Sequence, residues 1–320
     1  MNSLEHSIRR ILEVAAVVLL CSLDPESVWA GNSSVAVSSG TVVVPSASLS
    51  DQDRRPEGLA PGASGSPPSR EESQELLNAI AEARAALNAN PEDVPARFTL
   101  AYALQRRGLV ADAIREYQGL ILRQPTHVWA HNNLGTLLAQ RGEYHEAIVQ
   151  FGEVLKMEPL HATARFNSGL AFRKSGDLDW AMRQFELAVE ADPKHVDAHV
   201  SLGNGWYDRG QMDRAIEHFR MAIAVDPNHG AAHRNLAVAL LKKGGVADAV
   251  SEYRTAVRLL PNDGLLRYEF ADALEAKGDH QEAARQLRLF LHLHPGTDEQ
   301  RFLRKRAEAK LREFGSVPGE

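Results

Sequence analysis

Small and apolar residues recur every 34 residues between residues 94 and 297. In each repeat they fill two stretches of about a dozen residues with helical spacing, which predicts two amphipathic helices. The six copies begin at Val94, Val128, Ala162, Val196, Gly230 and Gly264. Because such a short unit buries its apolar face only against its neighbours, the pattern predicts one elongated α-solenoid.

Glycine and proline mark the ends of the predicted helices. Position 15 of the copies holds Gly108, Gly142, Gly176, Gly210, Gly244 and Gly278. Position 32 holds Pro125, Pro159, Pro193, Pro227, Pro261 and Pro295. Glycine suits a left-handed cap after the first helix, and proline stops the second helix.

Two small positions and one bulky position predict how the helices of a copy pack. Position 8 is Ala101, Gly135, Gly169, Gly203, Ala237 or Ala271, and position 20 is alanine in every copy. Position 24 is Tyr117, Phe151, Phe185, Phe219, Tyr253 or Leu287. We therefore expect close helix approach at the small residues, with the bulky side chain filling the space between them.

This combination of positions 8, 15, 20, 24 and 32 resembles the tetratricopeptide repeat family. The resemblance implies an all-α, right-handed solenoid of helix-turn-helix repeats that binds a protein or an extended peptide without catalysis. The chain departs from the family at position 4, where members often have tryptophan. Here position 4 is Arg97, His131, Arg165, His199, His233 or Arg267.

The flanking segments fit the same frame. Residues 71–93 match the second half of a repeat and predict a half-repeat cap helix before the six repeats of residues 94–297. Residues 298–320 predict a charged capping helix and tail. Residues 31–70 are rich in Ser, Gly and Pro, a composition typical of a disordered linker.

Residues 1–30 predict a signal peptide. Arg9 and Arg10 precede a short apolar run, and small residues flank Trp29 before a possible cleavage site after Ala30. We expect an exported protein, periplasmic or secreted; the alternative is a chance apolar helix in a cytoplasmic protein. The segment could also stay as a membrane anchor, while lipidation of Cys21 is disfavoured by the bulky Leu20 before it.

Composition and the absence of known motifs argue against several classes of function. The net charge of -6 argues against nucleic-acid binding, and the single cysteine excludes a disulfide framework or a cysteine-rich zinc module. The sequence contains no phosphate-binding loop, no nucleophile elbow and no His-Glu-x-x-His motif. We therefore expect no enzyme activity and no cofactor.

Repeated histidines raise the alternative of a metal site. His127, His195 and His229 each precede a position-4 histidine by four residues. A zinc site needs three or four ligands, and no third ligand recurs beside these pairs. Duplication of the repeat unit is the simpler explanation, so we predict no metal.

Asparagine occupies position 6 in three of the six copies, as Asn133, Asn167 and Asn235. This row resembles the asparagine ladder in the repeat superhelix of O-GlcNAc transferases, without their catalytic domain. The resemblance implies that the amides line the inner groove and bond the backbone of a bound peptide. The alternative is that these amides bond neighbouring helices.

The resemblance also implies that positions 2, 5, 9, 12 and 13 face the groove. These candidates are Phe98, Tyr102, Arg106, Trp129, Asn132, Phe166, Arg173, Lys174, Asn204, Tyr207, Arg234, Lys242 and Tyr268. Aromatic and basic groups together favour an acidic protein segment as partner. The lysine–asparagine carboxylate clamp of some family members occurs in no copy.

Two functions are compatible with this pattern. The first is an adaptor in envelope assembly or secretion. The second is a regulatory or targeting subunit of an enzyme complex whose catalysis resides on another chain. The sequence leaves the partner and the oligomeric state open.

Overall fold

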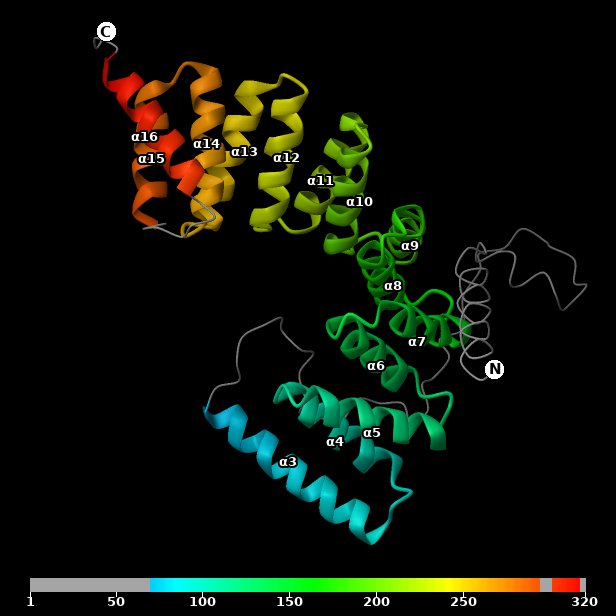
Figure 1. The fold of residues 1–320 in the computed structure, drawn as a ribbon. Coiled ribbons are helices and arrows are strands. Elements are labelled where there is room, and N and C mark those ends of the chain that lie inside the picture. The colour runs from blue at the N-terminus through cyan, green and yellow to red at the C-terminus, as the bar shows by residue number, and fades with distance from the viewer. Residues whose placement is uncertain (1–69, 294–300, 317–320) are drawn as a thin grey trace, which may run out of the picture. The chain divides into compact units, whose positions relative to one another are not determined.

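The computed structural model describes residues 70–293 and 301–316, and within these ranges every regular element is an α-helix. The predicted all-α fold of helix-turn-helix repeats is confirmed (Figure 1). The predicted signal peptide and residues 31–69 of the predicted linker lie outside the described residues, and Arg70, the last residue of that linker, begins the first described helix. No described helix is long and apolar enough to cross a membrane.

The described helices form two compact units, one ending at Ala191 and the other beginning at Asp192. The 34-residue period runs through this point unchanged, so the sequence gives no sign of the division. Each unit is therefore described by itself.

The first unit begins with a single helix and continues with three helix pairs, one pair for each copy. Its helices are α3 (Arg70–Ala89), α4 (Val94–Arg106), α5 (Val110–Arg123), α6 (Val128–Gln140), α7 (Tyr144–Met157), α8 (Ala162–Ser175) and α9 (Leu178–Ala191). The two helices of each pair pack against each other, and α3 packs against α4.

The second unit contains three helix pairs and a final helix. Its helices are α10 (Val196–Asp208), α11 (Met212–Val225), α12 (Gly230–Lys242), α13 (Val246–Leu259), α14 (Gly264–Lys277), α15 (His280–Leu293) and α16 (Arg301–Ser316). The last helix packs on α15, and its Lys310 pairs with Asp272 of α14 at 2.6 Å.

The position-15 glycines end the first helices as the sequence predicts. Gly176 and Gly278 are the C-caps of α8 and α14, with φ angles of 97° and 87°. Only glycine adopts this left-handed conformation without a steric penalty.

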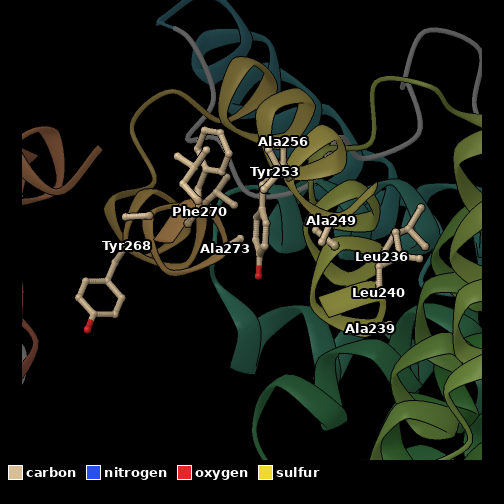
Figure 2. Close-up of a cluster of buried hydrophobic side chains, with 14 of the residues drawn as sticks. Leu236, Ala239, Leu240, Ala249, Tyr253, Ala256, Tyr268, Phe270 and Ala273 are labelled. Atoms are coloured by element: carbon tan, nitrogen blue, oxygen red, sulfur yellow. The ribbon is translucent and has the colours of Figure 1, made fainter. Parts of the chain in front are cut away.

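Position 8 and position 24 form the contact that holds the two helices of a copy together. In α10, a methyl group on Gly203 would lie 2.4 Å from a carbon of the Phe219 ring. Where position 8 is alanine, position 24 is a tyrosine or a leucine, as in Ala237 and Tyr253. Tyr253 is buried and lies among Ala249, Ala256 and Ala273 (Figure 2). The centres of the Tyr253 and Phe270 rings are 6.1 Å apart.

Candidate peptide-binding face

The first helices of the copies carry all of the predicted groove residues, but four of these side chains are buried. They are Phe98, Tyr102, Asn132 and Tyr268. In α4 the Phe98 ring stacks on Tyr102 and on His127, with centroid distances of 6.4 and 5.1 Å. These four residues help to pack the repeats and expose little area to a ligand. The prediction differs from the structure here because the position of a residue within the repeat does not by itself determine whether its side chain is buried.

The remaining candidates of the first unit leave part of their surface exposed. Trp129 and Phe166 are half-buried and pack on His161 and Phe185 respectively, while Arg106 is half-buried on α4. Arg173 and Lys174, in the last turn of α8, are exposed. Neither of these two cations has an ion-pair partner in the described part of the chain.

In the second unit the basic candidates Arg234 and Lys242 are already in contact with other side chains of the protein. Lys242 Nζ lies 4.5 Å from the centre of the Tyr207 ring. Arg234 donates two hydrogen bonds to the Glu269 carboxylate, at 2.8 and 2.6 Å. The Glu269 hydrogen bond raises the pKa of Arg234, against the opposing effect of burial. Because this charge is already neutralised, Arg234 is less suited to an acidic ligand than the sequence predicts.

The three position-6 amides differ in their partners. Asn133 donates to the Tyr117 hydroxyl at 3.0 Å, and Asn235 donates to the Asn204 Oδ1 at 2.9 Å. These two amides therefore bond neighbouring helices, as the alternative interpretation holds. The Asn167 amide has no hydrogen-bond partner among residues 70–293 and 301–316.

A cavity of about 240 Å³ lies beside Asn167. Helices α6, α7 and α8 supply its lining: Thr136, Ala139, Gln140, Tyr144, Phe151, Asn167, Leu170, Ala171 and Lys174. Only Asn167 and Lys174 of these are predicted site residues. Ala139 occupies position 12, which is one of the groove positions, but alanine is neither aromatic nor polar. Phe151 occupies position 24, which the groove positions do not include. The signal that could have found the cavity is the combination of these two residues.

The position-34 histidines cap the first helices. Nδ1 of His127 accepts the backbone N–H of Ala130 at 3.1 Å, and His161, His195 and His229 do the same at the starts of α8, α10 and α12. Asp93 and Asp263 fill this role in the first and last copies. A side-chain acceptor at this place satisfies a helix N–H that otherwise lacks a partner.

The position-4 side chains link the two helices of a copy by hydrogen bonds, and we call each such link a brace. In all six copies this side chain donates to the carbonyl of the proline six residues earlier. In five copies it also bonds the position-23 side chain of the second helix, as in His233 with Glu252 at 2.6 Å. In each histidine pair, the position-34 histidine therefore caps a helix, and the position-4 histidine bonds the preceding proline carbonyl and a side chain of the second helix of its copy. No group of three or more possible metal ligands exists within the described ranges.

One brace consists of two histidines. His199 Nε2 lies 3.0 Å from the Pro193 carbonyl, which only accepts, so this nitrogen carries a proton. The Nδ1 atoms of His199 and His218 lie 3.2 Å apart, which leaves room for one shared proton. Burial first, then the nearby charges of His199 and Arg214, lower the pKa of His218 below its ordinary 6.5, and Glu217 opposes this shift.

We predict that acid weakens this brace. Since the folded pKa of His218 lies below the unfolded value, the unfolded chain binds more protons as pH falls through about 6.5. The unfolding free energy should therefore decrease on acidification, by at most about 1.36 kcal/mol per pH unit for one proton. His218→Gln should make this decrease shallower, because glutamine occupies the position in the copies of Gln150 and Gln286. Denaturant titrations at pH 7.5 and 5.5 check this; parallel pH profiles would contradict it.

Comparison with known proteins gives the same fold. The tetratricopeptide repeat model matches residues 132–196, 174–229, 200–264 and 234–298. No curated protein matches the sequence. The crystal structure of YrrB, described as a TPR protein with an unusual peptide-binding site, superposes with a TM-score of 0.51 at 19% identity, over 60% of this chain and 97% of YrrB.

Two further solved structures are similar. The hetero-tetramer Cut9–Hcn1 gives a TM-score of 0.59 at 18% identity, over 74% of this chain and 47% of the matched chain. PilF of Pseudomonas aeruginosa gives 0.51 at 20% identity, over 59% of this chain and 88% of PilF. At sequence identities of 18–20%, these similarities show that the chain shares the fold of these structures and nothing further. Because the family model covers more than half of the sequence, the chain belongs to the tetratricopeptide repeat family, whose members are protein-interaction scaffolds.

Proposed function

We propose that this protein is a non-catalytic adaptor that binds an extended, acidic protein segment on the exposed face of α6 and α8. The observation that carries the proposal is the combination on α8 of the Asn167 amide with the cations Arg173 and Lys174, whose side chains have no hydrogen-bond or ion-pair partner among the described residues. An amide donates and accepts, so it suits the main chain of any sequence. The two cations favour carboxylates on the bound segment.

Half-buried aromatic side chains support this proposal. Trp129 on α6 and Phe166 on α8 offer rigid apolar surface, which is typical of protein-recognition sites. YrrB, a structural neighbour with the same fold, carries a peptide-binding site. A flexible segment loses chain entropy on binding, so we expect micromolar affinity.

We further propose that the adaptor works outside the cytoplasm, in envelope assembly or secretion. The charged, apolar and small-residue order of residues 1–30 supports export. Amino-terminal sequencing of the protein recovered from cell fractions tests this part, with cleavage after Ala30 as the expected result.

The binding proposal is tested by charge reversal of the two exposed cations. A random-sequence peptide library displayed on phage is selected on the full chain, and the enriched peptides are synthesised for affinity measurements. Arg173→Glu with Lys174→Glu should weaken their binding more than tenfold, because a hydrogen bond between charged groups contributes about 1.5–3 kcal/mol.

The matched control reverses two exposed cations on second helices, Lys156→Glu with Arg258→Glu. This control should bind the peptides as the unchanged chain does, and both variants should keep the helical circular dichroism. Failure to enrich any peptide, or equal loss of binding in both variants, would contradict the proposed function.

A further inference from the structure

The junction between the first and second copies is closed by a hydrogen-bonded trio. The Tyr117 hydroxyl donates to Gln105 Oε1 at 2.9 Å and accepts from the Asn133 amide at 3.0 Å. These residues occupy position 24 and position 12 of the first copy and position 6 of the second. The tyrosine hydroxyl and the glutamine thus fill the space beside the asparagine.

The next junction keeps the asparagine but lacks the other two polar groups. Phe151 stands where the first copy has Tyr117, and Ala139 stands where it has Gln105. Loss of the hydroxyl leaves the Asn167 amide without a partner in the part of the chain that the structure describes, and the smaller side chain at position 12 leaves a hollow. The cavity of about 240 Å³ lies at this point, between α6, α7 and α8.

At the junction between the fourth and fifth copies, different residues occupy the corresponding space and bond the asparagine. Tyr207 occupies position 12 there, and the Asn235 amide donates to Asn204 at 2.9 Å. Lys242, the counterpart of Lys174, lies against the Tyr207 ring. Of the three position-6 asparagines, Asn167 therefore has the amide that is open to a ligand.

We propose that this cavity is an anchor pocket for one apolar side chain of the bound segment, followed by an acidic residue. This inference rests on the proposed function and adds the chemistry of the segment. Phe151, Leu170 and Ala171 offer an apolar lining for the side chain. The Asn167 amide faces the main chain beside the anchor, and Lys174 at the rim pairs with the carboxylate of the following aspartate or glutamate.

A cavity-filling variant built from the chain's own residues tests the pocket. Ala139→Gln with Phe151→Tyr recreates the trio that Gln105, Tyr117 and Asn133 form in the preceding junction. Since that arrangement already exists in this fold, the variant should fold while its new side chains occupy the cavity and engage Asn167. We expect binding of the phage-selected peptides, synthesised with acetylated and amidated ends, to weaken more than tenfold.

A second variant removes the amide and leaves the cavity open. Asn167→Ala should weaken binding severalfold, whereas Asn235→Ala, whose amide is already bonded to Asn204, should leave it unchanged. On the peptide side, alanine in place of the apolar residue, or asparagine in place of the acidic one, should each weaken binding to the unchanged chain. The filled variant should be insensitive to the loss of the apolar residue, but it keeps Lys174 and should still bind less well when the acidic residue is changed to asparagine.

The outcomes separate this inference from the proposed function. If peptides bind the unchanged chain and the filled variant equally well, the pocket is wrong and the adaptor function stands. If the peptides depend on a free carboxyl terminus instead of an acidic side chain, the assignment of Lys174 is wrong. If the unchanged chain enriches no peptide at all, the proposed function itself is overturned.

Discussion

Replacing Phe219 by alanine is expected to lower the free energy of unfolding by about 3–5 kcal/mol. The Phe219 ring is 1% exposed and fills the space opposite Gly203, which has no side chain to relax into a void. Removing the ring therefore loses apolar burial and leaves a cavity between α10 and α11. Since a solenoid repeat contacts only its neighbours, we expect the loss to concentrate in the second unit.

Urea titration of the full chain with amide hydrogen exchange measures this effect. Phe302→Ala is the matched control, because the Phe302 side chain is 71% exposed and its removal should change stability by less than about 0.5 kcal/mol. Equal effects of the two substitutions would show that the ring at position 24 does not hold the helix pair together.

Replacing Arg165 by alanine is expected to destabilise the first unit by about 1–3 kcal/mol. Arg165 is 3% exposed, and its Nε and Nη2 atoms donate to the Pro159 carbonyl at 3.0 and 2.7 Å. Alanine would leave this carbonyl without its side-chain donor and would open space at the turn between the second and third copies. Denaturant titration detects the loss.

The chain supplies its own control for this position. Histidine donates to the equivalent carbonyl in three other copies, as His131 does to Pro125 at 2.9 Å. Arg165→His should therefore retain more than half of the stability that Arg165→Ala loses. If both variants lose the same amount, the hydrogen bond to the proline carbonyl is not the source of the stability.

The fold could be predicted because the residues that repeat every 34 positions are types with specific conformational effects. Glycine at position 15 and proline at position 32 fix where helices end, and the pairing of Gly203 with Phe219 shows how small and bulky positions fit. This information is local to one repeat and recurs six times. The division after Ala191 was not predictable, since the period continues unchanged through it.

The candidate site was predictable only in part. The asparagine row is visible in the sequence, but whether an amide is open depends on residues from other helices. Asn133 is engaged because Tyr117 has a hydroxyl, and Asn167 is open because Phe151 has none. The burial of Phe98 likewise depends on its stacking with His127, the last residue of the same copy, and the groove positions do not reveal this contact.

The proposed function requires that a protein segment binds on α6 and α8. The most direct test is a titration of the isotope-labelled full chain with one phage-selected peptide, read by backbone amide chemical shifts. We expect saturable shifts concentrated between Val128 and Gln140 and between Ala162 and Ser175, and their loss in Arg173→Glu with Lys174→Glu. Shifts confined to second helices such as α7 and α9, or shifts that persist in the charge-reversed variant, would contradict it.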